Sequence, residues 1–158
     1  KSNIKDNIEY INNQYQNDTD NINLNQSGIS NELQYKSNNT NIKIFSSFLS
    51  SKKENGSHQL RRPQKSYGFN LKKNLNLSMI KDLNLNILYN HYGKHFDVHS
   101  SNYSTIEMDS TDIVDLNLIK KFNNTDLFLK VSNLLDEGYQ RPHGYNQDGR
   151  ILKFGVKY

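Results

Sequence analysis

The sequence contains no cysteine and no tryptophan, and it has only two prolines. The lack of cysteine excludes disulfide frameworks, CxxC metal sites and thiol catalysis. There is also no run of about eighteen apolar residues, which excludes a transmembrane helix. A transmembrane β-barrel remains open, because only every second residue of each barrel strand meets lipid.

The chain has few apolar residues and a small net charge. The 158 residues are 34% hydrophobic, carry a formal net charge of +4 and have a mean hydropathy of −0.89, and Asn is the commonest residue. This is little apolar material for a soluble globule, yet Tyr, Phe, Leu and Ile are too frequent for a disordered chain. The length corresponds to one domain at most. The chain starts at Lys1 without a signal segment, so we expect it to continue from a longer protein.

Alternation with a period of two residues is the strongest positive signal. In the segment 82–90, Leu83, Leu85, Ile87 and Tyr89 share one parity and polar residues occupy the other. The same alternation occurs in 113–122, 125–133 and 151–158, and more weakly in 4–11, 29–36, 42–48 and 67–72. Because successive side chains of a strand point to opposite faces, the pattern predicts about eight strands. Most are near nine to eleven residues, long enough to cross a bilayer at a tilt.

The predicted connections alternate in length. Those at 37–40, 76–80 and 122–126 are short, whereas those at 12–26, 52–64, 93–111 and 135–149 are long. Short turns on one side and long loops on the other are typical of an up-and-down transmembrane barrel. We therefore expect an all-β, antiparallel fold whose leucines face lipid. The polar residues expected to line its wet interior are Glu32, Lys36, Lys72, Asp115, Lys121 and Lys130.

The C-terminal sequence resembles the closing strands of TonB-dependent outer-membrane receptors. Asn133, Leu134, Leu135, Asp136 and Tyr139 match the family's NLFDKxY element, Gly149 and Arg150 match its GR, and Tyr158 matches its terminal aromatic residue. The resemblance implies a 22-stranded barrel filled by an N-terminal plug that takes energy from TonB. Residues 1–158 would form about the last eight strands, without the plug and the earlier strands. GYN at 144–146 and LRRP at 60–63 are most similar to the cobalamin-receptor branch.

The long loops contain the candidate ligand-binding residues, since the resemblance places these loops outside the cell. They are Arg61, Arg62, Tyr139, Arg141, His143 and Tyr145. Aromatic and arginine side chains are common at recognition hot spots. The alternative is a rim that faces lipopolysaccharide headgroups. The direction of Arg150 stays open, because its parity points outward unless Gly149 introduces a bulge.

The last strand suggests a membrane-assembly signal. Leu152, Phe154, Val156 and Tyr158 alternate with polar residues and glycine, which resembles the signal read by the barrel-assembly machinery. The alternative is that they are only lipid-facing residues, with Tyr158 in the interfacial aromatic girdle.

Metal binding and catalysis have little support. His91, His95 and His99 are four residues apart, but four residues of a strand span about 13 Å, so we expect exposed loop histidines. The NQDG at 146–149 has oxygen ligands for calcium but is more typical of a turn. No nucleophile with its base, carboxylate pair or phosphate loop is present, so we expect neither an enzyme nor a bound cofactor.

The sequence thus favours an uptake receptor in the outer membrane of a Gram-negative bacterium. Its cargo would be a corrinoid first, and an iron siderophore or haem next. Its partners would be lipid and lipopolysaccharide, TonB through the plug, and the barrel-assembly machinery, but not nucleic acid.

Two alternatives remain open at this point. A complete eight-stranded structural or adhesive barrel requires closure that brings Ile8 beside Phe154. A secreted carbohydrate-binding β-sandwich instead buries its leucines against a second sheet. The leucines concerned are Leu83, Leu85, Leu116, Leu118, Leu127 and Leu129.

Overall fold

The computed structural model describes residues 5–11, 14–53, 56–76 and 81–158, with side chains described from residue 26 onward. Strands make up its regular structure. They are β1 (Lys5–Ile11), β2 (Gln14–Lys36), β3 (Thr40–Lys53), β4 (Lys65–Leu75), β5 (Leu83–Tyr92), β6 (His95–Val98), β7 (Thr105–Met108), β8 (Thr111–Phe122), β9 (Thr125–Ser132) and β10 (Ile151–Lys157). Within the described ranges, no helix is long and apolar enough to span a membrane.

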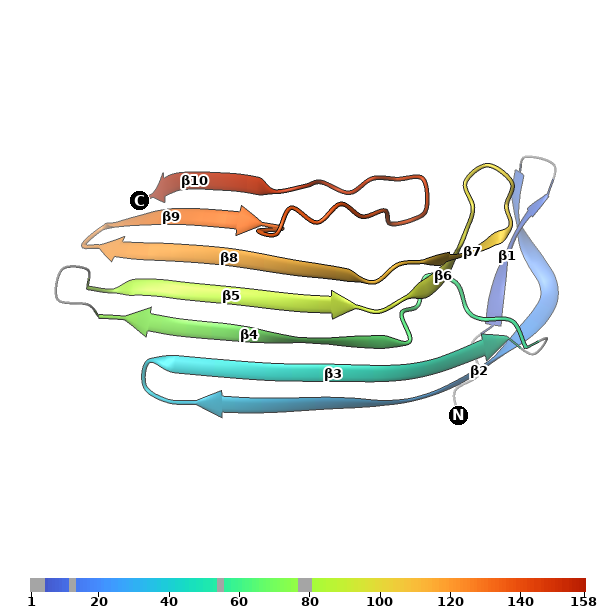
Figure 1. Cartoon of the computed structure of the whole chain (residues 1–158), viewed down its shortest axis with the longest axis horizontal. Helices are drawn as coiled ribbons and strands as arrows, with labels where there is room; N and C mark the ends of the chain where they lie inside the picture. The colour runs from blue at the N-terminus through green and yellow to red at the C-terminus, as the bar shows by residue number, and fades with distance from the viewer. Residues whose placement is uncertain (1–4, 12–13, 54–55, 77–80) are drawn as a thin grey trace.

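Eight of the strands form one antiparallel sheet in the order β1-β2-β3-β4-β5-β8-β9-β10. The short connections β2–β3 and β8–β9 lie at the same end of the sheet as the C-terminus (Figure 1). The longer connections leave from the opposite end, where β6 and β7 form a separate two-stranded hairpin. The all-β antiparallel fold predicted from the sequence is therefore confirmed, and the predicted sorting of connections by length holds from β2 onward.

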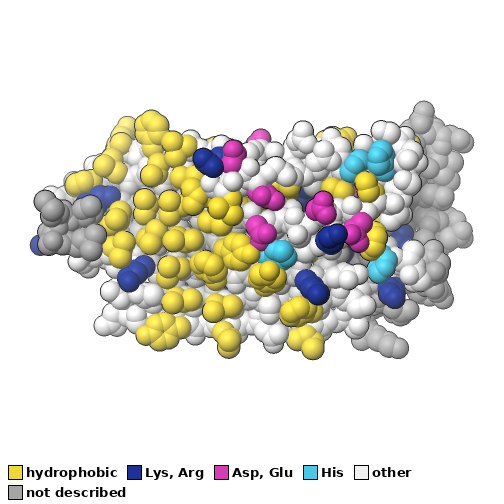
Figure 2. Space-filling view, in the orientation of Figure 1, with side chains coloured by type: hydrophobic (Ala, Val, Ile, Leu, Met, Phe, Trp, Pro, Cys, Tyr) yellow, Lys and Arg dark blue, Asp and Glu magenta, His cyan; other side chains and the backbone are white. Residues whose placement is uncertain are grey.

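One face of the sheet is apolar from strand to strand. Cross-strand pairing places residues of the same face directly opposite one another. The resulting row across seven strands is Tyr35, Ile42, Leu71, Ile87, Leu116, Val131 and Leu152. The neighbouring row is Leu33, Ile44, Phe69, Tyr89 and Val114. Figure 2 shows that hydrophobic side chains gather toward the end that carries the short turns.

This apolar face is open rather than packed. Val131 is the single apolar side chain that is buried among the described residues, whereas Leu33 is 73% and Phe154 80% exposed. Among the described residues, the one other sheet is the β6–β7 hairpin, whose strands contact no strand of the eight-stranded sheet. The β-sandwich interpretation is therefore wrong, because its six leucines would be buried. Strand after strand with an exposed apolar face is the pattern of a barrel wall that faces lipid.

The sheet is also not closed. β1 and β10 are its two edges, and Ile8 pairs with Asn17 while Phe154 pairs with Leu129. The closed eight-stranded barrel is therefore not the observed architecture. Each edge leaves a row of backbone groups available to a further strand.

The opposite face is polar. One row on it reads Lys36, Asn41, Lys72, Asn86, Asn117, Lys130 and Lys153. The six polar residues predicted to line the interior all lie on this face. One of them, Glu32, forms an ion pair with Lys43 at 2.8 Å. The prediction of a two-faced wall is thus confirmed.

The predicted long connections are partly strand. The segment 12–26 was expected to be a loop, but β2 begins at Gln14 and is 23 residues long. The segment 93–111 contains β6 and β7, and β3 extends to Lys53. Asn and Asp are depleted in strands, so polar segments without alternation read as loops. Backbone pairing with β1 forms the strand all the same. Ile4 of the predicted first strand and residues 77–80 of the predicted second turn lie outside the described residues.

Candidate ligand-binding surface

At the end of the sheet that carries the longer connections, the loops come together around the strand β6. The ring of His58 stacks on Phe96, with centroids 4.5 Å apart and planes at 17°. Leu60 forms a parallel bridge with Phe96. The backbone N–H of Arg61 donates to the carbonyl of Phe96 at 2.6 Å. These contacts tie the β3–β4 connection to the β5–β8 connection.

Asp97 is at the centre of this convergence, with only 1% of its surface exposed. Its Oδ1 accepts hydrogen bonds from Arg61 Nε at 2.8 Å and from the Val98 N–H at 2.7 Å. Its Oδ2 accepts from the His143 N–H at 2.9 Å. Burial alone would raise the pKa of Asp97, but the hydrogen bonds from Arg61, His143 and Val98 outweigh burial and hold the pKa below its usual value. A charged carboxylate therefore joins three segments of the chain.

The last long loop packs against the same hairpin. The His143 ring lies 4.5 Å from the His99 ring, and its Nδ1 accepts from the Ser100 N–H at 3.1 Å. The Arg141 guanidinium lies 4.9 Å above the Tyr92 ring in cation–π geometry. Tyr145 is 66% exposed. The surface thus offers cationic, imidazole and aromatic groups close together.

Two residues hold the base of this last loop. Asn133 is 5% exposed, and its amide donates to the carbonyls of Glu137 and Asp148 while its Oδ1 accepts from the Glu137 N–H. Asp136 Oδ1 accepts from the Arg150 N–H at 2.7 Å. Both side chains belong to the motif that carried the family resemblance. That motif was the available signal, but their joint function in closing the loop was not predicted.

The direction of Arg150 follows from the same contacts. Arg150 precedes β10, and its Nε donates to the carbonyl of Leu134 at 2.9 Å. Its side chain therefore folds back on the base of the loop.

The structure does not bring the six predicted ligand residues together. Arg61, Arg141 and His143 belong to the loop cluster around β6, whereas Tyr139 lines a hollow of about 280 Å³ together with Asp115 and Asn133. Arg62 and Tyr145 are exposed.

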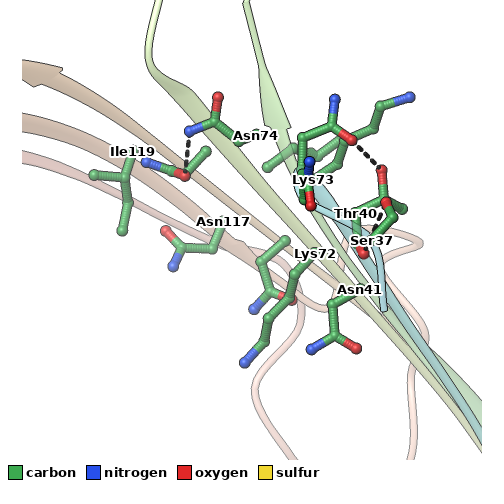
Figure 3. A pocket seen from close by; sticks show the side chains of 13 residues that line it. Ser37, Thr40, Asn41, Lys72, Lys73, Asn74, Asn117 and Ile119 are labelled. Carbon is green, nitrogen blue, oxygen red and sulfur yellow. Dashed lines mark hydrogen bonds between the residues drawn. The ribbon is translucent and has the colours of Figure 1, made fainter. Parts of the chain in front are cut away.

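A larger polar hollow, which sequence reasoning missed, lies at the short-turn end of the sheet. It measures about 400 Å³, and Asn41, Lys72, Asn74, Asn86 and Asn117 are among its lining residues (Figure 3). Asn74 Nδ2 donates to Asn84 Oδ1 at 3.1 Å. The side-chain oxygens of Asn74 and Asn86 are buried without a partner among the described residues. The hollow therefore presents amide acceptors and an amine to whatever fills the space.

The three spaced histidines have separate environments. His91 Nδ1 lies 2.8 Å from Asp112 Oδ1, and His99 contacts His143. The expectation of exposed loop histidines is wrong, because none of the three is exposed: His91 on β5 and His99 are half-buried, and His95 on β6 is 8% exposed. Across the described part of the chain, no three His, Asp or Glu side chains are placed to hold one metal ion, the NQDG segment included.

Comparison with solved structures finds the same fold in larger proteins. The fold is that of a segment of the barrel of TonB-dependent outer-membrane receptors. The structure of the FpvAI–pyocin S2 complex matches with a TM-score of 0.74 and 16% identity, over 90% of this chain and 20% of its own. The ferripyoverdine receptor of the outer membrane of Pseudomonas aeruginosa, bound to ferripyoverdine, matches with 0.72 and 15% over the same shares. The FrpB iron transporter from Neisseria meningitidis matches with 0.68 and 14%, over 98% of this chain and 26% of its own.

These matches concern the fold and leave the finer assignment open. The chain spans about a fifth to a quarter of the length of the structures it matches. No protein-family model matches the sequence, and no curated protein matches it. The similarity to the cobalamin-receptor branch is not supported by these structures, whose names refer to a siderophore complex and to iron.

Proposed function

We propose that the chain is the C-terminal part of the barrel of a TonB-dependent uptake receptor in the outer membrane of a Gram-negative bacterium. The observation that carries the proposal is the continuous apolar face across seven strands with almost no buried core. Such a sheet is stable only where hydrocarbon covers one face and further strands pair with its edges. The match to receptor barrels over 90% of the chain agrees with this setting.

The cargo we propose is a ferric siderophore. Related folds are named for ferripyoverdine and for iron. Arg61 and Arg141 at the loop end provide cations for the anionic oxygens that chelate iron. A corrinoid is the second candidate, favoured by the LRRP and GYN segments.

A plug inside the barrel is the partner that we propose for the polar face. The amide-lined hollow offers buried acceptors at Asn74 and Asn86. Backbone N–H groups of a folded segment would satisfy them, since buried polar groups are normally paired. TonB would act on this plug from the periplasmic side.

We propose that the apolar face contacts lipid and that the last strand is bound during assembly in the membrane. Leu152, Phe154 and Val156 are 60%, 80% and 53% exposed on the apolar face, and Tyr158 is fully exposed. We propose that lipid covers them after the barrel-assembly machinery has bound this strand. Arg62 and other exposed cations of the loops would contact lipopolysaccharide.

Transport by the complete receptor tests this function. The gene that contains this chain is expressed in a Gram-negative strain without its own iron-chelate and cobalamin receptors, and uptake of radiolabelled ferric siderophores and cobalamin is measured with and without TonB. We expect iron uptake that requires TonB. Uptake that is independent of TonB, or fractionation of the protein outside the outer membrane, would contradict the proposal.

Two tyrosine variants of the complete receptor test whether the ligand contacts the last loop. Tyr145→Ala should weaken uptake, because Tyr145 is an exposed aromatic residue of the last loop. Tyr103→Ala is the matched control, since Tyr103 is 75% exposed on the tip of another connection.

A further inference from the structure

We infer that Asp97 is a positioning residue that joins three separate loop segments into one surface for an anionic ligand group. This inference deepens the receptor function proposed above and rests on it for the identity of the ligand. The three hydrogen bonds to Asp97 come from Arg61, from Val98 next to it, and from His143. Arg61 and His143 are 36 and 46 residues away along the chain.

The backbone of Arg61 supports the inference independently. Its φ is +59°, in the left-handed region that residues with a Cβ rarely adopt. The conformation is held from both ends of the residue, because the N–H donates to Phe96 and Nε donates to Asp97. An uncommon backbone conformation persists where the surrounding contacts over-determine it. The contacts with β6 therefore fix the position and conformation of Arg61.

Arg61 and His143 each have a further polar group that takes no part in these contacts, and these groups define the chemistry of the ligand. The Arg61 side chain remains 59% exposed while only its Nε is used by Asp97. His143 accepts at Nδ1 from Ser100, so a neutral ring carries its proton at Nε2. Both free groups are donors. They fit the oxygens of an anionic ligand such as a catecholate or a carboxylate.

Distances between two of the loops test whether Asp97 holds them together, and this measurement needs no ligand. The 158 residues contain no cysteine, and any cysteine elsewhere in the complete receptor is first replaced by serine. Tyr103→Cys and Gly138→Cys then introduce two spin labels, one on the β5–β8 connection and one on the last loop. We expect one narrow distance distribution in the parent. Asp97→Ala should replace it by a broad one, and Asp97→Asn should fall between, because its amide oxygen still accepts hydrogen bonds.

Asp109→Asn is the matched control, since the Asp109 side chain is 95% exposed on the same connection. It should leave the distribution unchanged. Barrel assembly is followed in parallel by heat-resistant mobility in gels. If Asp97→Ala fails to assemble, Asp97→Asn carries the test. A distribution in the assembled Asp97 variants as narrow as in the parent overturns the inference.

Binding separates this inference from the proposed function. The probes are a ferric tris-catecholate, which is anionic, and a ferric tris-hydroxamate, which is neutral. Affinity for the anionic probe should fall about tenfold in Asp97→Ala, the loss of roughly one charge-assisted contact, and recover in part in Asp97→Asn. Equal affinity in parent and variants overturns the positioning role. If the parent binds neither probe, the proposed cargo is wrong, while the label distances still decide whether Asp97 joins the loops.

Discussion

The Phe128 ring on β9 lies over Gly155 on β10, its cross-strand partner. A Cβ added to Gly155 would come within 2.8 Å of two ring carbons. A larger side chain must therefore push the ring aside or bend the edge strand. We expect Gly155→Val to destabilise the assembled barrel by about 1–3 kcal/mol, measured as a lower temperature at which the complete receptor loses its folded gel mobility.

Gly138→Val is the control for this variant, because nothing lies within 4 Å of a Cβ at that position. Equal loss of stability in both variants would show that the Phe128–Gly155 contact is not what limits the space on β10.

The two faces of β8 can be compared with adjacent residues. Leu116 belongs to the central apolar row, and Asn117 lines the polar hollow on the other face. Leu116→Arg should cost about 2–4 kcal/mol if it faces the middle of the bilayer, whereas the polar lumen tolerates Asn117→Arg. The free energy of folding of the complete receptor into lipid vesicles measures both. A larger loss for Asn117→Arg would reverse the assignment of the faces.

The base of the last loop depends on Asn133. Its φ is +50°, and its amide bonds to Glu137 and Asp148. Asn133→Ala removes these part-buried hydrogen bonds, each worth about 0.5–1.5 kcal/mol, so we expect faster cleavage of the segment 134–149 by added protease. Asn146→Ala serves as the comparison, since Asn146 makes an exposed hydrogen bond to Gln140. Indistinguishable cleavage rates would exclude Asn133 as the residue that closes the loop.

The loop cluster should loosen on acidification. Burial lowers the pKa of His95 from its usual 6.5, and Arg141 lowers it further. Above pH 6.5 the residue is neutral in both closed and opened loops. Below that value the opened loop takes up a proton before the closed loop does, so the closed form loses stability until the lower pKa of the closed form is reached.

The spin-label distances between residues 103 and 138 report this change. We expect the distribution to broaden as pH falls below 6.5 in the parent and to stay constant in His95→Gln. Asp97 keeps its charge throughout, because its pKa lies below 3.8. Broadening that persists in His95→Gln would assign the transition to another group.

Much of the wall was predictable because its signal is local. The alternation of Leu83, Leu85 and Ile87 with asparagines predicts a strand with one apolar face, and the structure has that strand. The same reasoning failed at 14–26, where both parities are mostly polar and pairing with β1 and β3 forms the strand. Short motifs are also informative, since Asn133 and Asp136 belong to the element that resembles the receptor family and both form hydrogen bonds at the base of the last loop.

The sequence by itself determined the alternating strands of the wall and the apolar face of each, because period-two alternation is a property of neighbouring residues. Only the tertiary structure decided which loop residues meet. Arg61, Asp97 and His143 carry no common spacing, and they come together because pairing of the long strands brings the ends of distant connections to one place. The buried carboxylate of Asp97 lies at this place and accepts hydrogen bonds from the donors that those connections provide.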